Sequence, residues 1–352
     1  MASGSMWAAV YRGENKIAIE SVPIPQIGPG EALIRVLACG VCGTDLKKIH
    51  YGLVPPPRIF GHEICGRIKA LGAGVTGFQV GERVSVTHHV PCLNCHYCRY
   101  QSSAQCPKYR ETGTTAGFTP AGGGFAEYVR VMDWVVKRGM VLVPEAVSDD
   151  AATFIEPLNT CLKAVYRAEA KEGESALVIG QGPIGLLFTQ LLAVRGITVI
   201  AADPLKARRE QSLRFKAAAA CDGDPTSWMT AAMRWTDERG FDLVILTAPN
   251  AELISSAMQA ARAGGRLLLF GQTKKDDPFT VDAGTICSAE KSLIGSYSSD
   301  ISLQAEVADL IFSHRVDVDS LVTHRFQLSE IERAIEVAST PRDGVLKVMV
   351  NP

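Results

Sequence analysis

Short runs of alternating or continuous apolar residues dominate the first 147 residues. The clearest runs lie at 16–19, 31–36, 63–69, 83–87 and 126–131, and prolines and glycines separate them. Because proline and glycine end strands and form turns, these runs indicate short β-strands at close spacing. Many short strands in succession predict a small antiparallel sheet or barrel.

The pattern changes at residue 148. Residues 148–150 resemble a helix start, and 151–166 has a helical pattern interrupted only by Pro157. Beyond residue 173 the pattern predicts strands at 176–179, 198–202, 243–246 and 266–270, with helices at 184–194 and 205–215. Strands that alternate with helices predict a parallel sheet covered on both faces.

The chain is expected to leave this parallel sheet at about residue 286. Helices are predicted at 302–312 and 329–338, and a closing strand at 344–350. The predicted fold class is therefore α/β, with a mainly β domain and a doubly wound parallel-sheet domain.

Length and charge limit the classes of protein that fit. A chain of 352 residues is too long for one ordinary hydrophobic core, which predicts two domains. A net charge of −1 opposes a nucleic-acid or membrane partner, and no apolar run is long enough to span a bilayer. Residues 1–5 are expected to be a cloning remnant before the native Met6.

Four of the ten cysteines are spaced as a metal site. Cys92, Cys95, Cys98 and Cys106 form the pattern C-x2-C-x2-C-x7-C, which can place four thiolates around one ion. Zn²⁺ prefers such a closed tetrahedral sulfur shell, so a structural zinc is predicted. Such a cluster without a signal peptide favours reduced thiols and a cytoplasmic protein.

Three other interpretations of these cysteines stay open. They could be unrelated loop residues. Cys106-Pro107 suggests an iron–sulfur cluster, although the last gap here has seven residues and a ferredoxin run has about three. A nucleic-acid zinc module would need a basic loop, and Arg99, Lys108 and Arg110 are too few.

A dinucleotide site is predicted where a strand meets a helix after residue 179. Gly180, Gly182 and Gly185 have the G-x-G-x-x-G spacing. The first glycine permits the tight turn, the second lets the backbone approach a pyrophosphate, and the third lets strand and helix pack closely. The pyrophosphate is then expected at the helix N-terminus, beside Pro183 and Ile184.

The end of the next strand predicts which nicotinamide cofactor binds. Asp203 stands there, and a carboxylate in this place accepts hydrogen bonds from the adenosine ribose and repels a 2′-phosphate, which predicts NAD rather than NADP. Arg208 follows as either an adenine contact or a solvated surface residue. A plain tight turn is the alternative interpretation of the glycines.

A second metal site is predicted from Cys42, His62 and Glu63. A catalytic zinc takes about three protein ligands and keeps one position open. Glu156 is a further candidate because it stands in an apolar segment, where a solvated charge is unexpected. Either glutamate could complete the site.

These motifs together carry a family resemblance. The chain resembles the zinc-dependent medium-chain dehydrogenases, in particular the sorbitol/threonine dehydrogenase branch. The four-cysteine loop and the glycine motif match, as do residues 39–45, 61–63, 81–84, 123–128 and 156–158. The resemblance is specific for the family and much less specific for the substrate.

The resemblance implies a domain order. A GroES-like, mainly β catalytic domain is expected over residues 6–155, with a structural zinc loop at 92–106. A Rossmann NAD-binding domain is expected over 156–290, and a return to the catalytic domain over 291–352. Relatives are dimers or tetramers, so a homodimer or homotetramer is expected.

The resemblance also implies the metal ligands. Cys42, rather than Cys39, falls on the catalytic zinc cysteine, His62 on the histidine ligand, and Glu63 on the glutamate that this branch uses. Glu156 falls where liver-type alcohol dehydrogenases place a second cysteine. One catalytic and one structural zinc are expected per chain. The other cysteines are expected to be small buried residues: Cys39, Cys65, Cys161, Cys221 and Cys287.

Thr44 matches the residue that takes the alcohol proton. Many relatives end the proton relay with a histidine where this chain has Lys47. His50 could replace it, could be a surface residue, or the relay could end in water. Substrate contacts are expected near Tyr51, Phe60, Phe118 and residues 295–298.

The resulting hypothesis is an NAD-dependent zinc alcohol dehydrogenase. It would oxidise a secondary alcohol of a small-molecule polyol, sugar alcohol, cyclitol or amino alcohol to the ketone by reversible hydride transfer. An NADPH-dependent carbonyl reductase is an alternative that Asp203 opposes. A non-catalytic NAD-binding or redox-sensing protein is a second alternative, but it would have no use for an open zinc site.

Overall fold

The β-rich first part of the sequence forms one domain of the computed structural model, which describes residues 4–87, 90–100, 103–112, 122–248, 250–271, 277–340 and 344–352. A three-stranded sheet has the order β2-β1-β4, and a larger sheet has the order β15-β16-β3-β5-β6-β8, with β7 paired to β3. Their bounds are β1 Ser5–Gly13, β2 Lys16–Pro23, β3 Ala32–Gly40, β4 Arg58–Ile59, β5 Glu63–Leu71, β6 Arg83–Val86, β7 Tyr128–Val131, β8 Met140–Leu142, β15 Val322–Gln327 and β16 Lys347–Asn351.

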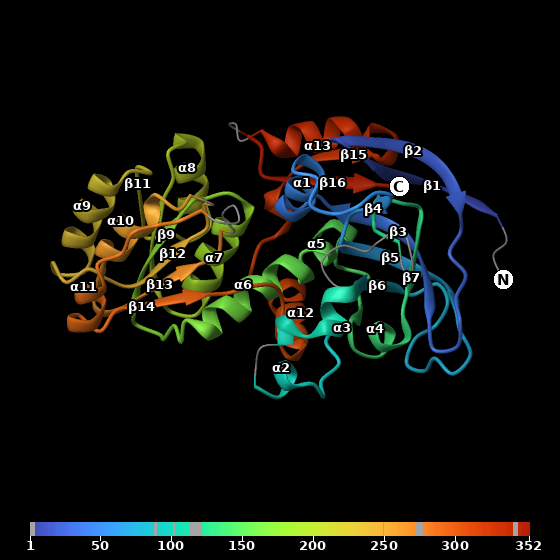
Figure 1. The fold of residues 1–352 in the computed structure, drawn as a ribbon, viewed down its shortest axis with the longest axis horizontal. Coiled ribbons are helices and arrows are strands. Elements are labelled where there is room, and N and C mark those ends of the chain that lie inside the picture. The colour runs from blue at the N-terminus through green and yellow to red at the C-terminus, as the bar shows by residue number, and fades with distance from the viewer. Residues whose placement is uncertain are drawn as a thin grey trace.

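Both ends of the chain contribute to this domain. The last strand, β16, pairs antiparallel with β3 and parallel with β15. The helices α1 (Gly43–His50), α4 (Asp133–Arg138) and α13 (Ile331–Ser339) belong to the same half of the molecule (Figure 1). The domain therefore closes only when residues near position 40 meet residues near position 350.

The second domain has six parallel strands in the order β11-β10-β9-β12-β13-β14. This is the doubly wound order of a dinucleotide-binding fold, and it confirms the predicted fold class. The strands are β9 Ser175–Ile179, β10 Thr198–Ala202, β11 Ala219–Cys221, β12 Phe241–Leu246, β13 Ala261–Leu269 and β14 Ser292–Gly295. The helices are α7 Pro183–Val194, α8 Lys206–Arg214, α9 Pro225–Trp235, α10 Leu253–Ala260 and α11 Ala283–Ser288.

Strand β14 corrects one expectation. The chain was expected to leave the parallel sheet at about residue 286, with a domain boundary at 290, but β14 pairs with β13 over residues 292–295. The boundary therefore lies beyond residue 295. This strand is short and lies at the sheet edge with largely exposed side chains, so it lacks the apolar run that marks a central strand.

Helix α6 (Ile155–Arg167) lies between the two domains (Figure 1). It follows α5 (Asp149–Thr153), whose first turn is capped by Ser148. Pro157 does not break α6, because it occupies the first turn, where no backbone N–H is needed. Side chains of α6 share one apolar core with α7 and with α12 (Gln304–Phe312). This core fixes the sheet of one domain against the other.

No helix in the described ranges is both long and apolar enough to cross a membrane.

Candidate active site

Three predicted metal ligands come together at the ends of β3 and β5. The Cys42 sulfur, a ring nitrogen of His62 and a carboxylate oxygen of Glu63 all lie within 4.8 Å of one another. Cys42 lies two residues after β3, at the N-cap of α1, and Glu63 opens β5 opposite Gly40 in the antiparallel register. Ligands of one zinc ion at 2.0–2.3 Å lie about 3–4 Å apart, so this donor set fits a zinc ion.

Asp45 organises this donor set. Its carboxylate is fully buried and lies 3.2 Å from Nδ1 of His62. The same side chain accepts hydrogen bonds from the backbone N–H groups of Cys42 and Gly61. A carboxylate on the far ring nitrogen of a metal-ligating histidine fixes the orientation of the ring. Burial disfavours a charged imidazole, but Asp45 and Cys42 outweigh it and raise the pKa of His62 well above its usual value.

Lys347 supplies a second buried partner. From β16 it forms an ion pair with Glu63 and donates a hydrogen bond to the carbonyl of Val41 at 3.2 Å. Burial lowers the pKa of a lysine, but the Glu63 carboxylate beside it raises the pKa of Lys347 above its usual value. Sequence reasoning assigned no role to Asp45 or Lys347. The Cys-Gly-Thr-Asp capping pattern could have indicated Asp45, whereas nothing local indicates Lys347.

The donor set lies at one end of a cavity of about 300 Å³. Glu156 and Thr160 from α6 line it, together with Thr44 and Lys47 from α1. Glu156 is buried in this cavity, although it is not one of the three clustered donors. The opposite walls come from the second domain: Ile184, Thr247, Phe270, Gly271, Ser296, Tyr297 and Ser298.

The predicted glycine turn precedes α7, whose Ile184 lines the cavity from that opposite side. Gly180 has φ +91° after β9, and a Cβ on Gly185 would lie 1.8 Å from the Gly180 carbonyl oxygen. Gly182 caps α7, and Pro183 is the first helical residue. Only glycine fits at positions 180 and 185, and the helix N-terminus that follows offers N–H groups to an anion.

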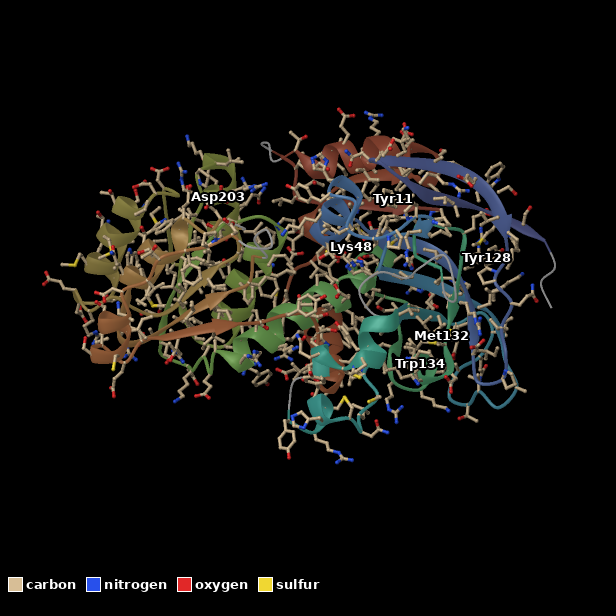
Figure 2. All side chains as sticks on the ribbon, in the orientation of Figure 1. Tyr11, Lys48, Tyr128, Met132, Trp134 and Asp203 are labelled. Carbon is tan, nitrogen blue, oxygen red and sulfur yellow. The ribbon has the colours of Figure 1, made fainter. Side chains whose placement is uncertain are left out.

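Asp203 and Arg208 lie beside this turn. The Asp203 side chain is 2% exposed and accepts hydrogen bonds from the backbone N–H groups of Gln181 and Leu205 at 2.7 and 2.8 Å. Figure 2 labels Asp203 in the domain on the left, below α8. Arg208 lies 3.8 Å from Asp203 and is mostly buried, which excludes the interpretation of Arg208 as a fully solvated residue.

Two buried polar atoms around the cleft fit a nucleotide. The Arg208 Nε and the Ser296 Oγ have no hydrogen-bond partner among the described residues. Buried donors are seldom left unsatisfied in folded proteins. Because Arg208 lies next to Gly182 and Ser296 lines the cavity, both atoms are placed where a dinucleotide would meet them.

The four cysteines of the loop also come together. Their sulfur atoms lie within 4.8 Å of one another, with Cys95 and Cys98 at 3.5 Å, too far apart for a disulfide. The loop around them carries α2 (His96–Arg99), η1 (Ser103–Gln105) and α3 (Pro107–Thr112). The backbone N–H of Asn94 is the main cause that lowers the pKa of Cys92 to about 6. This donor set fits an ion with tetrahedral coordination, such as zinc.

Other expected residues fall elsewhere. Phe60 is fully buried in the β domain against Tyr11 and does not line the cavity, so it cannot contact a substrate there. Tyr51 is 55% exposed, His50 is exposed, and Phe118 lies outside the described residues. Of the cysteines expected to be buried, Cys39, Cys65 and Cys161 are, whereas Cys221 is half-buried and Cys287 is exposed.

A metal-ligand cluster on one side of a cavity and the helix that follows a dinucleotide-binding turn on the other define a metal-dependent, nicotinamide-linked oxidoreductase. Residues 28–144 match the alcohol dehydrogenase GroES-like domain, and residues 183–313 match the zinc-binding dehydrogenase domain. The sorbitol dehydrogenase of Bacillus subtilis (strain 168) is 30% identical over 99% of this chain and 98% of its own length.

Solved structures agree with these matches. A zinc-binding dehydrogenase from Sinorhizobium meliloti 1021 bound to NADP has a TM-score of 0.88 and 28% identity, over 99% of this chain and 100% of that one. An Escherichia coli CFT073 alcohol dehydrogenase with NADH has the same TM-score, identity and coverage. The chain belongs to the zinc-dependent medium-chain dehydrogenase family and is sorbitol/threonine dehydrogenase-like. It is an enzyme that acts on CH–OH groups with zinc and a nicotinamide cofactor.

Proposed function

We propose that this enzyme oxidises a secondary alcohol of a polyol, sugar alcohol, cyclitol or amino alcohol to the ketone, with NAD as the hydride acceptor. The observation that carries the proposal is one cavity lined by Cys42, His62 and Glu63 on one side and, on the other, by Ile184 of the helix that follows the glycine turn. An alcohol bound between them would have its carbinol carbon next to the nicotinamide.

The residues of the cavity have separate tasks. A zinc ion held by Cys42, His62 and Glu63 would supply Lewis acidity to an alcohol oxygen. Asp45 keeps the imidazole of His62 oriented, and Lys347 balances the charge of Glu63 in its buried position. Glu156 adds a carboxylate to the same cavity, which favours a polyhydroxy or amino alcohol over a simple apolar one.

Thr44 is proposed to accept the alcohol proton, because it lines the cavity two residues after Cys42. Thr44→Val keeps the shape and removes the hydroxyl, so kcat is expected to fall about 100-fold, as for the loss of one acid–base group. Thr230→Val, on an exposed helix far from the cavity, is the matched control. Steady-state kinetics with near wild-type kcat for Thr44→Val would remove this residue from the mechanism.

NAD preference is proposed from the buried carboxylate of Asp203. Asp203→Asn removes the charge that repels a 2′-phosphate, so the ratio of kcat/KM with NADP to that with NAD is expected to rise about tenfold. Asp222→Asn, an exposed carboxylate paired with Arg209, controls for the loss of a nearby charge. A wild-type enzyme that already prefers NADP would instead favour the carbonyl reductase alternative.

The substrate class is tested directly with the wild-type enzyme. NAD and NADP reduction would be measured with a panel of polyols, cyclitols, amino alcohols and simple alcohols, before and after chelation. NAD-linked, chelator-sensitive turnover of one polyhydroxy or amino-alcohol class supports the proposal. Turnover of simple alcohols alone, or none by NAD-binding protein that contains zinc, contradicts it.

The four-cysteine cluster is proposed to hold a second, structural zinc. All four positions of a tetrahedral shell are supplied by sulfur, which leaves no open position for a substrate. Cysteines must be reduced to bind the ion as thiolates, so the cluster also favours a cytoplasmic location.

A homodimer joined through β14 is proposed as the minimal assembly. Within the described residues β14 pairs only with β13, so its outer edge can pair with a second copy, and Leu293 in this strand is 38% exposed. Leu293→Glu is expected to yield monomers in light scattering. Leu213→Glu, an exposed leucine on α8, is expected to leave the assembly unchanged. A wild-type monomer would refute the assembly.

A further inference from the structure

One wall of the cavity is the segment in which the chain returns from the second domain to the first. Residues 296–300 connect β14 to η2 (Ile301–Leu303), and Ser296, Tyr297 and Ser298 line the cavity. The segment contains no helix or strand, so its own hydrogen bonds cannot define its position.

Helix α6 holds this segment with three side chains. Asn159, Lys163 and Arg167 follow one another at four-residue intervals and therefore share one face of the helix. Asn159 Oδ1 accepts the backbone N–H of Asp300 at 2.8 Å, and Arg167 Nε donates to the Gly295 carbonyl at 3.0 Å. The segment is thus fixed to one rigid element at Asp300 and at the strand residue that directly precedes it.

Lys163 holds the middle of the segment. Its Nζ donates to the carbonyls of Tyr297 and Ser299 at 2.9 and 3.4 Å. The residue is 7% exposed, and burial lowers its pKa to about 8, with Asp300 and Arg167 as its charged neighbours. A buried lysine is uncommon unless its ammonium group is paired or hydrogen-bonded, and here the ammonium group donates to two main-chain carbonyls of the wall.

The opposite side of the segment meets the four-cysteine lobe. Tyr109 in α3 is almost completely buried, and its hydroxyl contacts the Ser298 hydroxyl. Tyr109 lies three residues after Cys106, in the first turn of α3. The wall therefore contacts α6, which also carries Glu156, on one side and the four-cysteine lobe on the other.

We propose that Lys163 is a positioning residue for alcohol binding: it fixes the cavity wall at Tyr297 and Ser299 relative to the helix that carries Glu156. This inference rests on the proposed function for its kinetic consequence. A wall that shifts loses contacts with the bound alcohol, which weakens binding and raises KM while the chemical step is unchanged. The position of the wall, and not the chemistry of the donor set, depends on Lys163.

The test compares Lys163→Met with Lys291→Met. Lys291 is a partly buried lysine that also donates to two main-chain carbonyls, those of Met258 and Ala261, but it lies away from the cavity. For Lys163→Met, the KM for the alcohol is expected to rise about tenfold, with changes below about threefold in kcat and in the dissociation constant for NAD. Lys291→Met is expected to leave all three unchanged.

Two further measurements keep the inference falsifiable. Lys163→Arg retains the donors and is expected to restore most of the KM, which a loss of packing alone would not explain. Hydrogen exchange of the Asp300 amide is expected to accelerate at least about tenfold in Lys163→Met and not in Lys291→Met. If Lys163→Met does not fold, Lys163→Gln replaces it in both measurements.

The outcomes separate the two proposals. Faster exchange in a protein that oxidises no alcohol would support the positioning role of Lys163 and reject the proposed function. An unchanged alcohol KM together with unchanged exchange in a folded Lys163 variant would overturn the positioning role of Lys163. A fall in kcat alone would also overturn it, because that result places Lys163 in the chemical step.

Discussion

Replacing His62 with alanine is expected to lower NAD-linked alcohol oxidation by about a thousandfold or more. Two ligands remain at Cys42 and Glu63, too few for a catalytic zinc site. Loss of a Lewis acid removes several kcal/mol of transition-state stabilisation, and each 1.36 kcal/mol is a factor of about ten in rate. The buried carboxylate of Asp45 also loses its imidazole partner, so the apo site is destabilised as well.

The measurement pairs kcat with metal content and NAD binding. His62→Ala is expected to lose close to one zinc per chain and to keep its affinity for NAD, because the glycine turn belongs to the second domain, between β9 and α7. His314→Ala replaces an exposed histidine and is the control. A His62→Ala enzyme with normal turnover and full zinc content would refute the proposed donor set.

Replacing Cys95 with serine is expected to release the second zinc and destabilise the four-cysteine lobe. The lobe has little regular structure besides α2, η1 and α3, so the ion is its main cross-link. Free zinc at a thousandfold above its dissociation constant stabilises the folded state by about 4 kcal/mol, so Tm is expected to fall by several degrees. Alcohol KM is also expected to rise, because Tyr109 contacts Ser298 from this lobe.

Thermal unfolding, zinc content and kinetics together test this expectation. Cys287→Ser removes an exposed cysteine outside both clusters and is expected to change none of them. Cys95→Ser should still contain the zinc at Cys42, His62 and Glu63 and should show measurable turnover. An unchanged zinc content would mean that the four cysteines bind no metal, and an iron stoichiometry would favour the iron–sulfur interpretation.

The sequence by itself determined the elements whose signals are local. Apolar runs of 176–179 and 198–202 placed β9 and β10 within a residue, because buried parallel strands are continuously apolar. Ser148 indicated the start of α5 through its capping side chain. The glycine turn and the four-cysteine loop were visible because each motif occupies a short stretch of chain. The edge strand β14 was missed, since half-exposed residues carry no such pattern.

Only the tertiary structure decided which distant residues share a site. Lys347 reaches Glu63 because β16 pairs with β3, and β3 pairs with β5, which brings together segments about 280 residues apart. Lys163 reaches Tyr297 because α6 packs between the domains. Sheet order and burial create these contacts, and they leave no periodicity in the neighbouring sequence. Local motifs therefore fixed the chemistry available to the site, whereas packing fixed its orientation and its walls.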